Sequence, residues 1–278
     1  MREVRALSNP SGPGNRWRPA PLIRASFALH AGALAALAAQ PRWWPWAAGS
    51  IAANHLLLTV LGLLPRSTLL GPNWTRLPPQ SRARCEVALT FDDGPDPEVT
   101  PRVLDLLDAA GVQGTFFCIG GRAARHPGLC GEIVERGHAV ENHTQNHGHG
   151  FSLLGPRGLA REIRSAQETL TSITGQAPRF FRAPAGLRSP LLDPVLSRLD
   201  LRLATWTRRG FDTRTRDPGR VARRLTRGLA AGDILLLHDG NAARTPDGEP
   251  MVIRVLPDLL RDIAGSGLRP VALRSLLG

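Results

Sequence analysis

Short apolar runs alternate with segments of helical periodicity from Cys85 to the end of the chain, and this alternation constrains the fold more than any other feature. Strands that alternate with helices are typical of a parallel sheet, and about seven such units indicate an α/β barrel, complete or incomplete. We expect strands at residues 86–91, 114–118, 139–141, 180–181, 201–206, 234–237 and 270–273, and helices at 101–110, 123–136, 159–173, 191–199, 218–229 and 252–264.

The chain before this domain contains two uncharged apolar stretches, at 25–41 and 43–64, with a Trp-rich turn between them. As helices they would span roughly 25 and 33 Å, and a bilayer core is about 30 Å thick. Trp side chains prefer the membrane–water interface. We therefore expect residues 25–66 to form a membrane hairpin, preceded by a basic flexible arm (1–24) and followed by a Pro-rich linker (67–84).

Two other interpretations of the apolar stretches remain open. The first stretch resembles a signal-peptide core with a cleavage site at 36–38, although the second stretch then has no explanation. Alternatively, both stretches are soluble helices packed on the domain. In a membrane hairpin, Arg residues flank both outer ends against Arg42 alone in the turn. The positive-inside rule then places the main domain on the cytoplasmic face, whereas a single span reverses this orientation.

The net charge of +12 comes from Arg alone, because the sequence contains no Lys. The absence of Tyr and the abundance of Ala, Gly and Pro indicate a GC-rich coding bias, so the choice of Arg carries little functional information. The Arg residues are scattered, which favours a membrane surface over a nucleic acid as partner, and no protein partner follows from the sequence. Cys85, Cys118 and Cys130 are too widely spaced for a disulfide framework, and we expect three buried thiols.

Acidic and His residues follow the first and third expected strands, where the active site of a barrel forms. Asp92 and Asp93 are adjacent at a strand end and point to opposite sides, so one can bind a metal while the other acts as a base. His143 and His147 have the i, i+4 spacing that places two His on one face of a helical turn. With Asp93 they form a two-His, one-carboxylate metal set, although each motif alone also fits solvated surface residues.

Two further candidates follow later strands. Arg182 lies among apolar neighbours and needs a carboxylate partner, for which Asp92 is available. His238 ends a very apolar strand at the expected mouth of the barrel, where it is a natural general acid. Taken singly, Arg182 also fits a surface position beside a turn, and His238 also fits a satisfied core His.

These motifs resemble one family when they are taken in order along residues 85–278. The family is that of the polysaccharide deacetylases, also called the NodB homology domain or carbohydrate esterase family 4. The resemblance implies a distorted (β/α)7 barrel and a divalent metal, with zinc first and cobalt, nickel or manganese as alternatives. The motifs are Thr-Phe-Asp-Asp-Gly at 90–94, His-Thr-x-x-His at 143–147, Arg-x-Pro at 182–184 and Leu-x-His-Asp at 236–239.

The same resemblance implies a role for each motif residue. Asp92 would be the catalytic base, oriented by Arg182, and His238 would be the general acid, tuned by Asp212. The metal ligands would be Asp93, His143 and His147.

Two positions depart from the family pattern. Ala185 stands where the family often has Tyr, but the backbone N–H that helps to bind the oxyanion survives this change. Thr213 stands where the family often has a Trp that lines the acyl pocket, which leaves formyl or another acyl group open beside acetyl.

The expected activity is therefore hydrolysis of an N-acyl group, foremost N-acetyl, from an amino sugar in a glycan or lipid-linked saccharide, giving a free amine and a carboxylate. Arg208 and Arg209 lie near Asp212 in sequence and have the geometry to bind phosphate, which together with a membrane hairpin makes a deformylase of a lipid-phosphate-linked amino sugar one alternative. An exposed Arg-rich loop is the other interpretation of these residues. A non-catalytic saccharide- or lipid-binding module on the same barrel is the alternative from another class.

Overall fold

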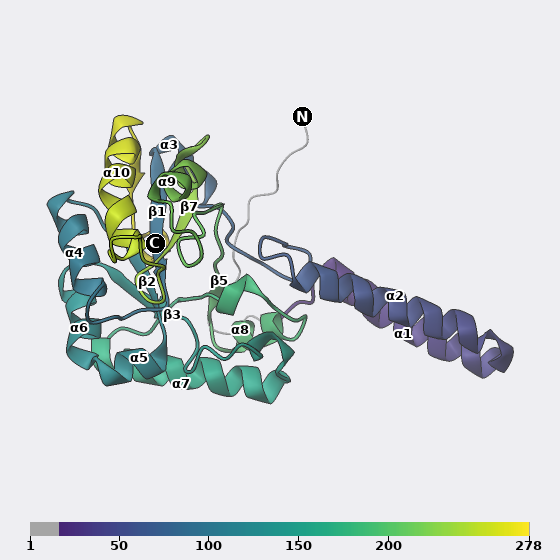
Figure 1. Ribbon diagram of the computed structural model, residues 1–278. Helices are drawn as coiled ribbons and strands as arrows, with labels where there is room; N and C mark the ends of the chain where they lie inside the picture. Colours follow the sequence, from purple (N-terminus) through teal and green to yellow (C-terminus); the bar gives the residue numbers. More distant parts are fainter. Residues whose placement is uncertain (1–16, 278) are drawn as a thin grey trace.

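A curled parallel sheet forms the centre of the molecule in the computed structural model, which describes residues 17–277 (Figure 1). The hydrogen-bonded strand order is β5-β4-β3-β2-β1-β7-β6, and β8 pairs with β1. This arrangement confirms the expected distorted barrel. The strands are β1 (Glu86–Asp92), β2 (Thr115–Cys118), β3 (Ala139–Asn142), β4 (Phe180–Phe181), β5 (Arg202–Leu203), β6 (Arg208–Arg209), β7 (Ile234–His238) and β8 (Arg269–Pro270).

Helices between the strands cover the outside of the sheet, as the alternating pattern predicts. The expected helix at 123–136 is divided in two because Pro127 begins a new helix and cannot continue the preceding one. The expected strand at 201–206 is reduced to β5, and β6 was not expected. The helices of this domain are α3 (Pro79–Ala83), α4 (Thr100–Ala109), α5 (Gly120–Arg125), α6 (Pro127–Glu135), α7 (Pro156–Thr174), α8 (Leu192–Arg198), α9 (Pro218–Thr226) and α10 (Met251–Gly265).

Strands β1 and β7 lie side by side at the middle of the sheet and are buried along their whole length. Their register places Asp92 opposite His238, and Asp92 also lies opposite Phe117 of β2. Because the strands are parallel, their carboxyl ends meet at one edge of the sheet. The polar residues that end these apolar strands are thereby brought together.

Residues 67–84, expected as a linker, pack into the wall of the barrel. The N–H of Trp74 donates to the carbonyl of Leu203, and the N–H of Thr205 donates to the carbonyl of Trp74, at 2.8 and 3.0 Å. The N–H of Leu77 donates to the carbonyl of Gly232 at 2.9 Å. The segment therefore bridges β5 and the residues that precede β7. These bonds join residues far apart in the sequence, so the Pro-rich composition gave no sign of them.

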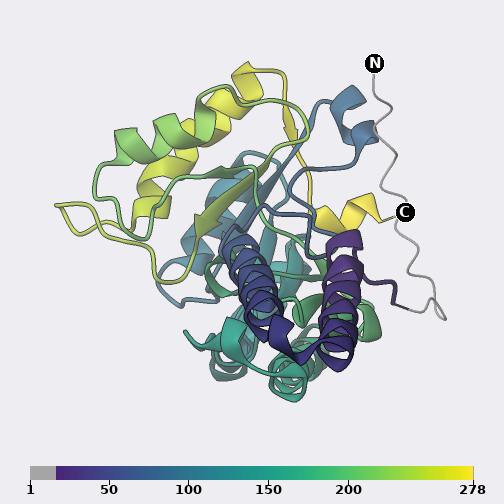
Figure 2. The same cartoon turned by 90° about the vertical axis from the view of Figure 1, so that its right-hand side faces the viewer.

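The two apolar stretches form the expected helical hairpin, which protrudes from the domain (Figures 1 and 2). Helix α1 (Pro21–Ala39) and helix α2 (Trp44–Gly62) are joined by a short 3-10 turn, η1 (Pro41–Trp43). Polar side chains connect the helices, as they do in apolar surroundings. Asn54 Nδ2 donates to Ser26 Oγ at 2.8 Å, and the Nε2 atoms of His30 and His55 are 3.3 Å apart.

Within residues 17–277, α1 is the one helix that is long and apolar enough to cross a membrane. Core helices of soluble proteins and signal sequences can have the same length and composition, but α1 is largely exposed. Helix α2 does not meet the same measure, although the sequence favoured the second stretch as the longer span. Helix α1 begins at Pro21, inside the expected arm, and residues 1–16 of that arm lie outside the described residues. Cys85, expected to be buried, is exposed.

Candidate active site

Asp92 and Arg182 form a buried ion pair at the end of β1. The Arg182 side chain is fully buried, and its NH1 donates to Asp92 Oδ1 at 2.6 Å and to Thr90 Oγ1 at 2.9 Å. Its remaining nitrogens donate to the carbonyls of Ala204 and Thr205. A guanidinium with a fork of bonds to fixed acceptors holds one orientation. Arg182 thus fixes the position of the Asp92 carboxylate, as the sequence predicts.

Asp93, His143 and His147 converge beside this pair. Asp93 Oδ1 lies 3.3 Å from His143 Nε2 and 3.1 Å from His147 Nε2. One ligand atom from each of the three residues lies within 4.8 Å of the other two. Two nitrogens and one carboxylate oxygen form a donor set that suits zinc and related divalent ions.

The hydrogen bonds around this set orient it for a cation. His143 Nδ1 lies 2.8 Å from the carbonyl oxygen of Arg182, which can only accept, so we assign the ring proton to Nδ1. The Nε2 lone pair then faces Asp93 Oδ1. Asn241 Nδ2 donates to the other oxygen, Asp93 Oδ2, at 3.0 Å. Two lone pairs that face each other repel unless a proton or cation lies between them, and the three residues therefore fit a metal ion.

The Asp and His charges of this set favour one another, whereas the two imidazoles oppose each other. Burial alone would raise the pKa of Asp93, but His143, His238 and His147 together hold it well below its usual range. Burial disfavours the charged form of His143, yet Asp92 and Asp93 outweigh this and raise the pKa of that imidazole. Burial and the neighbouring His143 lower the pKa of His147. The carboxylate is therefore ionised across the physiological range and ready to bind a cation.

His238, which ends β7 next to Asp92 of β1, is held by Asp212. Its Nδ1 lies 2.9 Å from Asp212 Oδ1, and its backbone N–H donates to Asp212 Oδ2 at 2.8 Å. Burial opposes the charged imidazolium, but Asp212 and then Asp92 and Asp93 outweigh it and raise the pKa of His238 to about 9. The ring therefore carries a proton at neutral pH, as a general acid requires.

Backbone strain is concentrated around this site. Among the described residues, eight non-glycine residues have positive φ, and six of them lie in the loops that carry the site. Such conformations persist where surrounding structure holds them, and they cluster at functional sites. The six are Asp93 (73°), Thr144 (68°), His147 (51°), Ala185 (54°), Phe211 (61°) and Asn241 (58°).

The left-handed residues correct one step of the sequence argument. His143 and His147 were expected on one face of a helical turn, but the segment between them is an irregular loop. Thr144 and His147 have positive φ, and the N–H of His147 donates to Thr144 Oγ1 at 2.9 Å. The two imidazoles meet because this loop turns sharply, and their rings lie 4.8 Å apart.

Ala185 is the exposed residue of the 3-10 turn η3 (Pro184–Gly186), which follows β4 and is otherwise buried. Gly186 packs closely against Trp206 and Pro65. A Cβ atom at this position would lie 2.6 Å from the Trp206 ring and 2.7 Å from Pro65. Glycine is therefore required at this position. Trp206, which was not among the expected site residues, packs against this turn.

The side chains of Arg208 and Arg209 point to opposite faces of β6, because successive side chains alternate along a strand. Arg208 pairs with Asp233 at the start of β7 and donates to the carbonyls of Arg227 and Gly228, so it is a structural residue and not part of the site. Arg209 points the other way and lies 5.1 Å from the Trp206 ring. Its charge interacts with those of Asp92 and Asp212, and its Nε has no hydrogen-bond partner within residues 17–277.

A small polar cavity of about 220 Å³ opens beside His147. Asn241 and two arginines, Arg122 and Arg125, are among its lining residues. Arg122 also donates to the carbonyl of Asp93 and to Asn241 Oδ1, at 2.9 and 2.7 Å. The sequence analysis missed Asn241 and Arg122. Asn241 follows the His-Asp-Gly run directly, which was the available sign, whereas nothing in the sequence pointed to Arg122.

Comparison with known proteins agrees with this geometry. Residues 80–204 match the family model described as polysaccharide deacetylase. The chain is 31% identical over 193 residues to a peptidoglycan-N-acetylglucosamine deacetylase of Bacillus cereus, covering 69% of this chain and 87% of that protein. It is 36% identical over 155 residues to a chitooligosaccharide deacetylase of a Bradyrhizobium species, covering 55% and 70%.

The fold is also similar to a solved structure of a carbohydrate esterase family 4 pseudoenzyme from Bacillus anthracis. The TM-score is 0.66 and the sequence identity 20%, over 74% of this chain and 69% of that one. At this identity the likeness concerns the fold alone. The extent of the sequence match to the Bacillus cereus relative shows that the chain belongs to the polysaccharide deacetylase family, a family of hydrolases that act on carbon–nitrogen bonds.

Proposed function

We propose that this protein removes the N-acetyl group from N-acetylglucosamine residues of a glycan, with a divalent metal ion, foremost zinc, bound by Asp93, His143 and His147. The observation that carries the proposal is the convergence of both His Nε2 atoms on Asp93 Oδ1, within 3.3 Å, beside the Asp92–Arg182 pair. The names of the two relatives support the substrate class, since one is a peptidoglycan-N-acetylglucosamine deacetylase and the other a chitooligosaccharide deacetylase.

When bound, the metal would polarise the amide carbonyl and lower the pKa of a nearby water. Asp92, which Arg182 orients, accepts the proton of the attacking water. The N–H of Ala185 donates to the oxyanion that develops on the carbonyl oxygen. His238 donates the proton on its Nε2 to the departing amine, because Asp212 occupies its Nδ1. The products are acetate and a free amino sugar.

The polar cavity beside His147 and the half-buried Arg209 are the places we assign to the substrate. Hydroxyl-rich sugars are recognised by convergent polar groups, which this cavity supplies through Arg122 and Asn241. The free Nε of Arg209 supports contact with a polar or anionic group of the substrate. A lipid-linked amino sugar is the second substrate class that we consider, and the exposed apolar hairpin is the observation that favours it.

We further propose that α1 anchors the protein at a membrane. Its length, its apolar composition and its exposure support this placement. The expected cytoplasmic position of the domain rests on the Arg distribution alone.

The proposed activity is tested with the full chain purified in detergent, stripped of metal and restored with zinc. Acetate release is measured from N-acetylglucosamine oligomers and from a lipid-linked N-acetylated sugar, with Asp92→Asn as the matched inactive variant. Zinc-dependent release that Asp92→Asn abolishes is the expected result. Zinc binding without release from either substrate would instead favour a binding module.

A further inference from the structure

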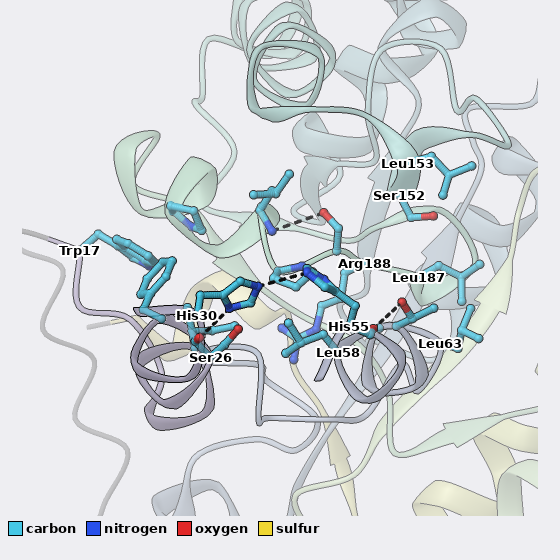
Figure 3. Close-up of a pocket in the computed structure, with 18 residues that line it drawn as sticks. Trp17, Ser26, His30, His55, Leu58, Leu63, Ser152, Leu153, Leu187 and Arg188 are labelled. Carbon is cyan, nitrogen blue, oxygen red and sulfur yellow. Dashed lines mark hydrogen bonds between the residues drawn. The ribbon is translucent and has the colours of Figure 1, made fainter. Parts of the chain in front are cut away.

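An apolar cavity lies away from the metal set, between the base of the hairpin and the barrel domain (Figure 3). Its volume is about 550 Å³, within the range of small-molecule sites. Apolar side chains dominate its lining, and they come both from the hairpin and from two loops of the domain. Among them are Ile23, Phe27, Leu58, Leu153, Leu187 and Leu191.

This cavity has a rigid frame. The N–H of Arg188 donates to the carbonyl of Gly62 at 3.1 Å, which ties the end of α2 to the domain. A Cβ atom on Gly62 would lie 2.2 Å from the Arg188 carbonyl oxygen, so only glycine permits this approach. On the hairpin side, His30 and His55 bridge α1 and α2 (Figure 3). The cavity is thus built by fixed contacts between hairpin and domain.

One cationic group lines this apolar cavity. Arg188 is only 5% exposed, and its NH2 donates to the carbonyl of Ser67 at 2.5 Å. Its Nε is buried and has no hydrogen-bond partner among residues 17–277. The negative charge of Asp193 acts on the guanidinium from a distance, but no described carboxylate forms an ion pair with it. A buried guanidinium with a free donor requires an acceptor, and an anionic one satisfies its charge as well.

We propose that this cavity is a binding site for an anionic membrane phospholipid, with one acyl chain in the apolar space and the phosphate against Arg188. An apolar cavity whose lining includes a guanidinium without an ion-paired carboxylate among residues 17–277 matches the chemistry of such a lipid. Its position matches too, since the wall formed by α1 and α2 continues into a surface of exposed apolar side chains, including Leu34, Leu56 and Val60. The proposal rests on the membrane association of the hairpin but not on the deacetylase activity.

The domain loops that line the cavity continue from the active site. Ser152 and Leu153 follow the loop that carries His147, and Leu187 follows the η3 turn that carries Ala185. A lipid in the cavity would therefore contact the backs of two loops that form the site. The proposed lipid site and the metal site are therefore formed by neighbouring segments of the chain.

The site is tested by photolabelling. The full chain is placed in phosphatidylcholine vesicles that contain a phosphatidylglycerol with a photoreactive acyl chain, and the adducts are mapped by mass spectrometry. We expect adducts on the loop residues Ser152, Leu153 and Leu187, which unlabelled phosphatidylglycerol displaces and phosphatidylcholine does not. Adducts on the outer face of the hairpin, at Leu34 or Leu56, report membrane contact separately.

Two variants of the cavity lining and one control variant test whether the labelled lipid lies in the cavity. Thr59→Phe fills the cavity from α2, and we expect it to reduce the loop adducts about 10-fold while the outer-face adducts persist. The matched control is Leu57→Phe, which adds a ring on the same helix outside the cavity lining and should change neither. Arg188→Gln should remove the preference for phosphatidylglycerol, and if it fails to fold, Thr59→Phe decides.

Three results would overturn the proposal. The first is labelling confined to the outer face of the hairpin, which would leave membrane association intact and the cavity empty of lipid. The second is loop labelling that Thr59→Phe does not reduce. The third is displacement by a polyprenyl-phosphate sugar but not by phosphatidylglycerol, which would assign the cavity to a substrate carrier. None of these results depends on zinc or on acetate release, so the proposal and the deacetylase function fail separately.

Discussion

Asp212 contacts His238 twice, through the imidazole Nδ1 at 2.9 Å and through the backbone N–H at 2.8 Å. The carboxylate thereby fixes both the position of the ring and the nitrogen that faces the substrate. Asp212 is also the largest of the groups that raise the pKa of His238 to about 9 against the effect of burial. A single residue therefore sets the orientation and the protonation of the proposed general acid.

Replacing Asp212 by Asn should move the alkaline limb of the pH–activity profile to lower pH. Since the raised pKa keeps His238 protonated below about pH 9, the acid is active at neutral pH and is lost as the pH rises through that value. Without the Asp212 charge, burial lowers the pKa, and we expect a shift of roughly 1–3 pH units together with a lower kcat. The shift is measured from the pH profiles of kcat/KM of the two proteins. An unchanged alkaline limb would assign that limb to another group.

Metal binding should depend on Asp93, His143 and His147 and on one residue behind them. His147→Ala removes a ligand and should weaken zinc binding by at least about 100-fold in equilibrium dialysis. Asn241→Ala removes the hydrogen bond to Asp93 Oδ2, and we expect a loss of about 10- to 100-fold. His149→Ala is the matched control, because this exposed imidazole lies outside the donor set. Equal affinity of the His147→Ala variant and the control would contradict the assignment.

Arg182 should be needed for stability as well as for activity. Arg182→Met leaves Asp92 as a buried charge without its partner, which should lower the free energy of unfolding by about 3–5 kcal/mol. Urea denaturation measures this change. The control is Arg244→Met, which removes an exposed pair with Glu98 at 2.6 Å and should cost at most about 1 kcal/mol. Similar losses in both variants would mean that the buried pair adds nothing beyond a surface contact.

The site residues that could be predicted from the sequence lie at the ends of strands that the sequence itself reveals. The continuous apolar runs of β1 and β7 identify these two as central strands, and the carboxyl ends of central strands locate the site. Asp92 ends β1 and is followed by Asp93, and His238 ends β7. His143 follows β3, which also has a readable pattern. The apolar runs of β1 and β7 could be recognised without any knowledge of the fold, so the positions at their ends could be predicted.

The parts that could not be predicted depend on short elements and non-local contacts. Strands β4, β5 and β6 have two residues each, too few for any periodicity. For this reason the sequence could not tell Arg208 from Arg209, although neighbouring residues in a strand face opposite sides. The left-handed loop before His147 likewise depends on tertiary contacts.

The barrel wall formed by residues 67–84 yields the last prediction. Leu77 is only 4% exposed and packs with Phe180 and Ile234 of the sheet. If the segment belongs to the barrel, Leu77→Ala should lower the free energy of unfolding by about 2–4 kcal/mol, because it leaves a cavity in the core. Leu69→Ala is the control, since Leu69 lies in the same segment but is 54% exposed, and we expect a change within about 0.5 kcal/mol. A free linker would make the two variants equally stable, so the difference between them measures how firmly this segment is part of the folded domain.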